Sequence, residues 1–320
     1  MIRLAVTLVA AIAASVSAQG NPAMEEPIEA PGPKGPLAGI LLKAGSESWP
    51  VALIIPGSGP TDRDGNNPLG VRAASYQLLA KGLAANSIAT VRIDKRGMFG
   101  SVAAVPDANA VTLADYVADT AAWVSVIRER TCVPCVWLIG HSEGGLVALA
   151  SAREVEGLCG LVLIATAGRR LGDVLKAQLR ANPANAPLLE AAENAIDRLA
   201  VGERVDATTL PPPLVPLFNP AVQGFLISTI ALDPAELARN AQLPILIVQG
   251  GKDLQVTLED AKLLAAAAPS AKLTILPEAN HVLKDIKGKS RAENIAAYAA
   301  PDLPIANNLI PTITEFIRLR

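Results

Sequence analysis

Aromatic residues and histidines are scarce in this chain of 320 residues. Aromatic side chains make up 3% of the sequence, and only two histidines occur. So few rings leave little material for stacking against nucleic-acid bases or sugars. Basic residues number 28 against 30 acidic ones, with no basic run, so nucleic acid is not predicted as a partner. The 51% of hydrophobic residues indicates a folded globular protein, whose length fits one large domain with an insertion.

The N-terminus has the pattern of an export signal. Arg3 is followed by an apolar stretch, and Val16 and Ala18 supply the small residues that precede a cleavage site. Because the apolar stretch is too short to span a bilayer, we predict a cleaved secretory signal over 1–18. The protein is then periplasmic or secreted, with no stable membrane anchor. A segment rich in Pro and Gly follows, and we expect 19–36 to be flexible.

Three cysteines occur in the chain. Cys132 and Cys135 form the sequence CVPC, and Cys159 stands alone. In an oxidising compartment we predict a small disulfide between Cys132 and Cys135, with free thiols as the alternative. A thioredoxin-type redox motif is disfavoured because that motif opens a helix, whereas CVPC leads into an apolar strand. The two histidines and single Cys pair also disfavour a zinc site.

Short runs of Val, Ile and Leu alternate with segments of helical composition. Continuous apolarity over four to six residues is typical of strands buried on both faces of a parallel sheet. We predict an α/β fold, an open, mostly parallel sheet with helices on both faces. An antiparallel edge strand over Leu37–Lys43 could precede it. The predicted central strands are Val51–Ile55, Ala89–Ile93, Val136–Ile139, Leu161–Ala165, Ile245–Val248 and Leu273–Leu276.

The alternation stops between Gly168 and Asn240. This stretch has helical pieces and a Pro-rich segment, but no strand pattern. We predict that 168–240 is a helical cap, inserted into a core made of 37–167 and 241–320, and that it covers one end of the sheet.

A strand-to-helix turn carries the strongest chemical signal. Gly140-His141-Ser142-Glu143-Gly144 matches the pattern G-x-S-x-G between a predicted strand and a predicted helix. This sharp turn holds its central residue in a strained conformation, so its neighbours must be small. We predict Ser142 as a nucleophile. The N–H of Glu143, at the start of the helix, is the first predicted oxyanion donor.

The choice of a base for this serine is narrow. His141 lies inside the turn, where its side chain should point away from the Ser142 hydroxyl. His281, on the loop after the last predicted strand, is therefore the predicted base.

A carboxylate should orient the imidazole of the base. Asp253 follows a predicted strand and precedes His281, as the chain order of nucleophile, acid and base requires. Glu278 and Asp285, near the histidine, are the alternatives. This chemistry needs no metal and no organic cofactor.

The second oxyanion donor is predicted in the loop 56–60, PGSGP. Glycines on both sides of Ser58 let its N–H face a substrate oxygen, although a plain tight turn would also use them. The residues predicted to border the substrate are Gly57, Gly59, Asp62 and His141.

These motifs together resemble those of bacterial carboxylesterases of the α/β-hydrolase superfamily. The resemblance implies an α/β-hydrolase fold with a helical cap, the catalytic set Ser142, Asp253 and His281, and oxyanion donors at Ser58 and Glu143. Many esterases have His-Gly before the first donor, where this chain has Pro-Gly. The matching segments, in family order, are Pro56–Asn66, Arg92–Ser101, Gly140–Gly145, Gln249–Asp253 and Ala279–His281.

Two further charged motifs receive structural interpretations. The spacing of 62–66, DRDGN, is that of a calcium loop, but Asn67 and Ala73 stand where Gly and Glu are needed. We expect a hydrogen-bonded loop beside the active site. The sequence 94–97, DKRG, follows a buried strand and predicts internal ion pairs rather than an anion site.

The sequence as a whole predicts a serine hydrolase. We expect it to cleave small-molecule carboxylic esters, with short- to medium-chain acyl groups, through an acyl-enzyme. A serine aminopeptidase or acyl-peptide hydrolase is the alternative, with Glu143 and Asp62 as ligands for a substrate ammonium. A binding protein on the same fold is less favoured, because all three catalytic residue types are present.

Overall fold

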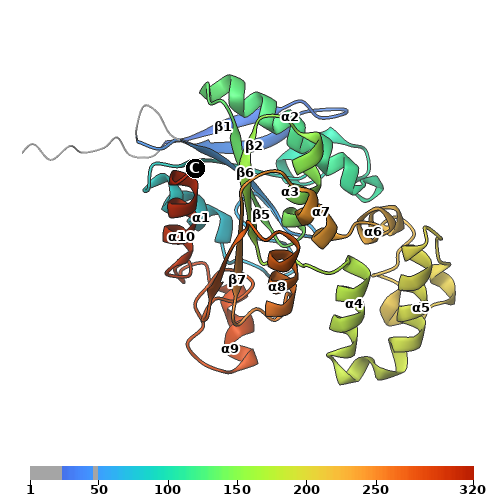
Figure 1. The fold of residues 1–320 in the computed structure, drawn as a ribbon. Coiled ribbons are helices and arrows are strands. Elements are labelled where there is room, and N and C mark those ends of the chain that lie inside the picture. The colour runs from blue at the N-terminus through green and yellow to red at the C-terminus, as the bar shows by residue number, and fades with distance from the viewer. Residues whose placement is uncertain (1–23, 46–49) are drawn as a thin grey trace, which may run out of the picture.

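The computed structural model describes residues 24–45 and 50–320, so the signal predicted over 1–18 lies outside the described residues. Its centre is a sheet of eight strands in the order β1-β2-β4-β3-β5-β6-β7-β8 (Figure 1). Pairs from β4 through β8 are parallel, whereas β1 and β2 join antiparallel. The strands are β1 (Glu25–Ala30), β2 (Leu37–Leu42), β3 (Val51–Ile55), β4 (Ala89–Ile93), β5 (Val136–His141), β6 (Leu158–Ile164), β7 (Ile245–Gly250) and β8 (Lys272–Leu276).

The N-terminal strand corrects two predictions. Residues 19–36 are predicted to be flexible, but Glu25–Ala30 form β1 along β2. Ile28 buries its side chain in the core, and the Glu25 carboxylate lies 2.7 Å from the Arg92 guanidinium. Because β1 covers β2, the outermost strand is β1 and not the predicted Leu37–Lys43. The short alternation of exposed and buried residues in β1 was not recognised, because Pro and Gly residues surround it in the sequence.

Helices cover both faces of the sheet, as the sequence predicted (Figure 1). Successive residues of β3 point to opposite faces, so Leu53 joins one apolar cluster and Ile54 the other. The cluster of Leu53 includes side chains of α2 (Leu113–Thr131), α3 (Glu143–Glu154) and α8 (Leu258–Ala267). The cluster of Ile54 includes side chains of α1 (Ser75–Ala84) and α10 (Leu309–Arg318). The small helix α9 (Arg291–Ala296) follows the loop after β8.

The segment between β6 and β7, residues 165–244, consists of helices and loops without a strand, and the structure describes all of it. Its helices are α4 (Leu171–Arg180), α5 (Leu189–Ala200), α6 (Gln223–Ile230) and α7 (Pro234–Asn240). A third apolar cluster, which includes Ile196 and Phe218, lies within this segment. Helices α4 and α5 stand to one side of the sheet, whereas α7 packs on α3 and α8 (Figure 1).

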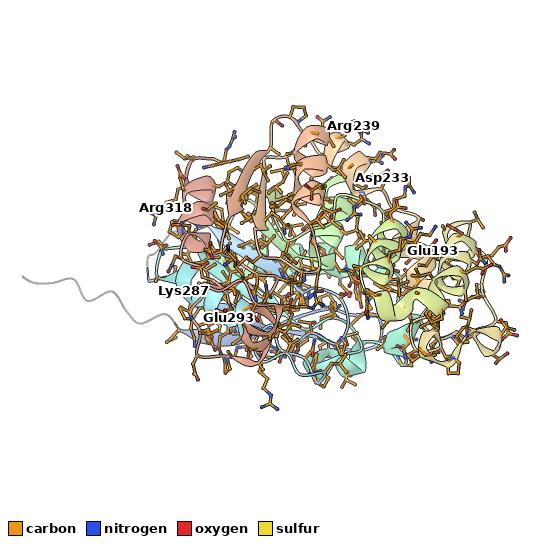
Figure 2. All side chains as sticks on the ribbon, turned by 90° about the horizontal axis from the view of Figure 1, so that it is seen from below. Glu193, Asp233, Arg239, Lys287, Glu293 and Arg318 are labelled. Carbon is orange, nitrogen blue, oxygen red and sulfur yellow. A yellow bond between two sulfur atoms is a disulfide. The ribbon has the colours of Figure 1, made fainter. Side chains whose placement is uncertain are left out.

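Charged side chains are spread over the surface. Arg239, Lys287, Glu293 and Arg318 are exposed; Lys287 and Glu293 lie near each other, and Arg239 lies well apart from them (Figure 2). In the part of the chain that the structure describes, every helix is too short or too polar to cross a bilayer.

The disulfide corrects the predicted pairing of Cys132 with Cys135. Cys135 is bonded to Cys159, with their Cα atoms 5.2 Å apart, and Cys132 is free and exposed. Val136 pairs with Leu158 in the parallel ladder of β5 and β6, which brings Cys135 and Cys159 to the same end of neighbouring strands. The sequence spacing of CVPC could not show this pairing, because it depends on the strand order of the sheet.

Candidate active site

Ser142 lies on a sharp turn between β5 and α3. Its backbone angles, φ 54° and ψ −118°, fall in a region that side chains rarely adopt. The turn needs glycine on both sides. A Cβ on Gly140 would lie 2.3 Å from the Gly144 oxygen, and one on Gly144 would lie 2.2 Å from the Ile55 oxygen. Close packing of Gly140 against the first turn of α3, and of Gly144 against the end of β3, therefore explains the G-x-S-x-G pattern.

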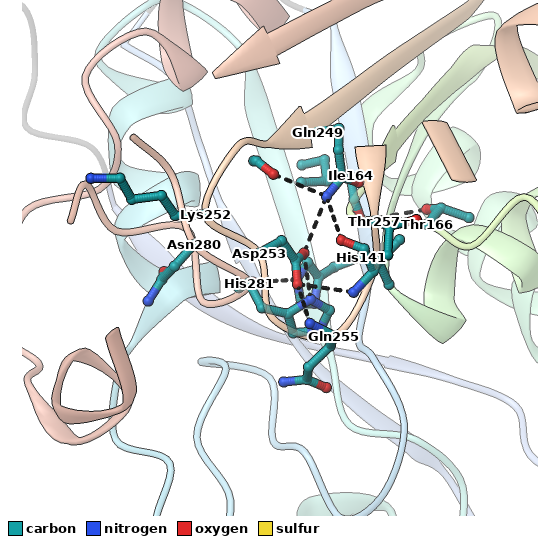
Figure 3. Close-up of polar contacts among 12 residues, drawn as sticks. His141, Ile164, Thr166, Gln249, Lys252, Asp253, Gln255, Thr257, Asn280 and His281 are labelled. Carbon is teal, nitrogen blue, oxygen red and sulfur yellow. Dashed lines mark hydrogen bonds and ion pairs between the residues drawn. The ribbon is translucent and has the colours of Figure 1, made fainter. Parts of the chain in front are cut away.

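Asp253 and His281 form a buried pair on the loops after β7 and β8 (Figure 3). The His281 Nδ1 atom lies 2.8 Å from Asp253 Oδ2. The other carboxylate oxygen accepts the N–H groups of Gln255 and Val256, at 2.7 and 3.0 Å. Gln249, which sequence reasoning assigned no role, donates to Asp253 Oδ2 at 3.3 Å. The carboxylate is thus held in place from both sides.

Burial and these partners shift the pKa of Asp253 in opposite directions. Burial by itself raises the pKa of this carboxyl. The charge of His281 and the hydrogen bonds from His281, Val256 and Gln255 outweigh burial, so the pKa of Asp253 lies below its usual range. The ionised form that could orient an imidazole is therefore the stable form at neutral pH.

Ser142 and His281 line one cavity of about 160 Å³. Ser58 and Tyr298 line it too. A second cavity of about 160 Å³ also contains Ser142 and Ser58, with apolar walls from Leu146 and from α4. The structure thus brings together Ser58, Ser142 and His281, which lie far apart in the sequence.

A third and larger cavity, of about 530 Å³, lies beside Glu143. Its walls are mainly apolar, and Glu143 also lines the second cavity. The apolar side chains of its wall include those of Met98, Phe99, Tyr116, Val222 and Phe225.

The loop predicted to supply an oxyanion donor is held by two hydrogen bonds at Gly57. The Gly57 N–H donates to the Tyr76 hydroxyl of α1 at 3.0 Å, and Lys95 Nζ donates to the Gly57 oxygen at 2.7 Å. A Cβ on Gly57 would lie 3.4 Å from the Ser142 Cβ, so this loop passes directly beside the elbow. Tyr76 was missed by sequence reasoning, since it lies in a helix without a recognisable motif.

His141 is buried and does not face the Ser142 hydroxyl as a base would. Its Nδ1 lies 2.8 Å from the Tyr76 hydroxyl, and its Nε2 lies 2.9 Å from the His281 carbonyl oxygen. Burial lowers the pKa of His141 to about 3, so its ring is neutral at pH 7. The His281 carbonyl oxygen can only accept, so the ring proton of His141 is on Nε2 and is donated to it. The other ring nitrogen, Nδ1, then accepts the Tyr76 O–H, while the Tyr76 oxygen accepts the Gly57 N–H.

Of the four residues predicted to border the substrate, three line a cavity and Asp62 does not. Gly57 and His141 line the cavity of Ser142 and His281, and Gly59 lines the larger cavity. Asp62 lines none of the three cavities. Its carboxylate accepts the N–H groups of Asp64 and Asn66, at 2.9 and 2.8 Å, and so closes its own loop.

The charges after β4 form the internal ion pairs that the sequence predicted. Asp94 accepts from the Arg63 side chain, with Nε to Oδ2 at 3.0 Å. Lys95 lies 3.3 Å from the Glu143 carboxylate. Arg96 Nε donates to Asp119 at 2.7 Å.

No group of three or more His, Cys, Asp or Glu side chains suited to a metal ion occurs among residues 24–45 and 50–320. In the loop 62–66, whose spacing is that of a calcium loop, the Asp62 carboxylate accepts backbone N–H groups.

A family profile described as Hydrolase_4, serine aminopeptidase S33, matches residues 69–284. The chain belongs to this family. This S33 chain is similar to esterase EstD of Thermotoga maritima, with 28% identity over 258 residues, which cover 78% of this chain and 58% of that protein. The chain thus spans less than two thirds of the length of this curated relative.

Solved structures similar to this S33 chain share its fold. The esterase Pf2001 of Pyrococcus furiosus is 15% identical, with a TM-score of 0.59 and coverage of 96% of this chain and 95% of that one. Est1E of Butyrivibrio proteoclasticus is 15% identical, with a TM-score of 0.55 and coverage of 91% and 99%. A thermophilic esterase of Thermogutta terrifontis is 19% identical, with a TM-score of 0.55 and coverage of 93% and 99%. The predicted α/β-hydrolase fold is confirmed.

Proposed function

We propose that this member of the S33 family is a serine esterase that hydrolyses small-molecule carboxylic esters. One observation carries the proposal. A buried Asp253–His281 pair lies at the same cavity as Ser142, whose backbone is strained at a strand-to-helix turn. The names of the similar proteins, EstD and Pf2001 among them, support esters as the substrates.

The proposed reaction starts with an attack of the Ser142 hydroxyl oxygen on the acyl carbon. His281 Nε2 takes the hydroxyl proton and then delivers it to the leaving alcohol. A water molecule, deprotonated by the same nitrogen, then releases the acid from the acyl-enzyme. Asp253 orients the ring through Nδ1 and stabilises the imidazolium. The N–H groups of Ser58 and Glu143 stabilise the negative oxygen of each tetrahedral intermediate.

The apolar walls beside Ser142 support esters with short- to medium-chain acyl groups. Leu171, Val174 and Leu175 of α4 line the second cavity with Ser142. Since α4 belongs to the segment between β6 and β7, we assign 168–240 the role of a cap over the site. The pattern of residues 1–18 supports export to the periplasm or the exterior.

The family description also names aminopeptidases, so peptide hydrolysis is the second candidate function. An aminopeptidase needs a carboxylate for the ammonium of its substrate. The two candidates for this role are already engaged, Glu143 with Lys95 and Asp62 with its own loop. These contacts favour the esterase.

The test compares two substrate classes and one nucleophile variant. The wild type should hydrolyse p-nitrophenyl esters of graded chain length faster than amino-acid p-nitroanilides. Ser142→Ala should lose ester turnover, and a fluorophosphonate should label Ser142 in the wild type, as located by peptide mass spectrometry. Ser87→Ala, which changes an exposed serine, is the matched control and should keep full activity. Ester turnover retained by Ser142→Ala would refute the proposal.

A further inference from the structure

The peptide group between Gly57 and Ser58 connects a buried lysine with the proposed oxyanion site. Its carbonyl belongs to Gly57 and its N–H to Ser58. In a planar trans peptide these two groups point in opposite directions. Lys95 Nζ donates to the Gly57 oxygen at 2.7 Å. The ammonium therefore sets the direction in which the Ser58 N–H points.

Lys95 is itself held firmly. It follows β4, its side chain is buried, and Nζ lies 3.3 Å from the Glu143 carboxylate. Nζ also lies 5.4 Å from the centre of the Tyr116 ring, within the range of a cation–π contact. Lys95 thus contacts the Gly57–Ser58 peptide, whose N–H is one proposed oxyanion donor, and the side chain of Glu143, whose N–H is the other.

We propose that Lys95 is a positioning residue for the oxyanion hole, which orients and polarises the Gly57–Ser58 peptide. An ammonium on the carbonyl oxygen draws electron density away from the peptide nitrogen. The Ser58 N–H then becomes a stronger donor, as in other charge-assisted and cooperative hydrogen bonds. The effect is largest when the substrate oxygen carries a full negative charge, in the tetrahedral intermediate.

The opposite side of Gly57 supports this assignment. Its N–H donates to the Tyr76 hydroxyl at 3.0 Å, so the residue is held at both its nitrogen and its oxygen. Without Lys95, the Gly57 N–H would stay in place while the following peptide could rotate. Lys95 touches no reacting atom in this scheme. This inference rests on the proposed esterase reaction.

The variant Lys95→Met keeps most of the side-chain length and removes the charge and the donor. Removal of an oxyanion donor costs about 10²–10³-fold in kcat, and loss of its orientation should cost part of this, about 10- to 100-fold. KM should change by less than about threefold, because the ground-state ester carries little charge. Affinity for a trifluoromethyl ketone, which binds serine hydrolases as a tetrahedral oxyanion, should fall by about the same factor as kcat.

A matched control separates positioning from stability. Arg96 is the next residue, is also buried, and donates to the main-chain oxygen of Asp115 at 2.8 Å. Arg96→Met should lower stability but leave kcat and the ketone affinity unchanged. Lys95→Met leaves the buried Glu143 carboxylate without its partner, which could impair folding. In that case a double variant, Lys95→Met with Glu143→Gln, removes this unpaired charge. It should show the same loss of affinity for the ketone.

The outcomes distinguish this inference from the proposed function. If the wild type hydrolyses no ester and takes up no fluorophosphonate, both are overturned. If the wild type is an esterase and Lys95→Met keeps its kcat and ketone affinity, only the role of Lys95 is overturned. An equal loss of kcat in Arg96→Met would likewise overturn it, since general destabilisation would then explain both variants.

Discussion

The Nε2–H of His141 donates to the backbone carbonyl of His281, with the two atoms 2.9 Å apart. These are the only histidines of the chain, and they have different tasks. The His281 ring pairs with Asp253, whereas the neutral His141 ring holds the His281 backbone and accepts from Tyr76. Through the Tyr76 hydroxyl and the Gly57 N–H, this chain of hydrogen bonds joins the loop of the proposed base to the oxyanion loop.

Tyr76→Phe should lower both stability and turnover. The change leaves two buried groups, the Gly57 N–H and His141 Nδ1, without a partner, which costs about 1–3 kcal/mol for each group. We expect the free energy of unfolding in urea to fall by about 2 kcal/mol or more, and kcat to fall because Gly57 precedes Ser58. Tyr298→Phe is the control for stability. Its hydroxyl bonds to the exposed Gln255 side chain, where water can take its place. An unfolding free energy equal to that of the wild type would contradict the role of Tyr76.

The buried His141 should make the protein sensitive to mild acid. Burial lowers its pKa from 6.5 to about 3 in the folded state. Below pH 6.5 the unfolded chain therefore binds a proton that the folded chain does not. The stabilisation is complete above pH 6.5 and is lost as the pH falls toward 3, by about 1.4 kcal/mol per pH unit.

The variant His141→Gln isolates this effect, since its amide can still donate to the His281 carbonyl but does not titrate. Urea unfolding of both proteins between pH 7 and pH 4 should show a steeper decline for the wild type. The carboxylates of the two proteins are the same, so their contributions cancel in the difference. Parallel declines would show that His141 is not held neutral.

Asp253→Asn should reduce kcat severely, by roughly 10⁴-fold, because an amide cannot stabilise the imidazolium or hold the correct tautomer of His281. Glu278→Gln is the matched control. Its carboxylate is half exposed and pairs with Lys252, whereas His281 Nδ1 pairs with Asp253. Initial rates with a p-nitrophenyl ester check both variants. If Glu278→Gln is impaired and Asp253→Asn is active, the acid has been assigned to the wrong residue.

The disulfide between Cys135 and Cys159 predicts one titratable thiol. Titration of the unreduced, denatured protein should find only Cys132. Cys159→Ser should lower the unfolding free energy by about 2–4 kcal/mol, because the bridge restricts the unfolded chain. Cys132→Ser should leave stability unchanged. Three free thiols, or a peptide map that links Cys132 to Cys135, would contradict the pairing.

Features that depend on neighbours in the sequence were predicted well. All six predicted parallel strands are present, with Val51–Ile55 and Ala89–Ile93 at their predicted bounds. The elbow was also recognisable, because the sharp turn at Ser142 leaves room only for glycine at 140, against the start of α3, and at 144, against the end of β3. These patterns reflect local burial and backbone geometry, which act over a few residues.

Features that depend on distant segments were missed or wrong. The partner of Cys135 is set by the register of β5 against β6, and β1 is stable only because β2 offers it an edge. Nothing near Tyr76 or Lys95 in the sequence indicates that both bind Gly57.

The sequence by itself determined the order of strands and helices, the strained serine and the two histidines from which a base could be chosen. Only the tertiary structure decided what each histidine does. His281 meets Asp253 and His141 meets Tyr76 because the sheet and its helices bring separate loops to one edge. Burial there removes water, so each ring must find its partners within the protein, and those partners set its charge and orientation.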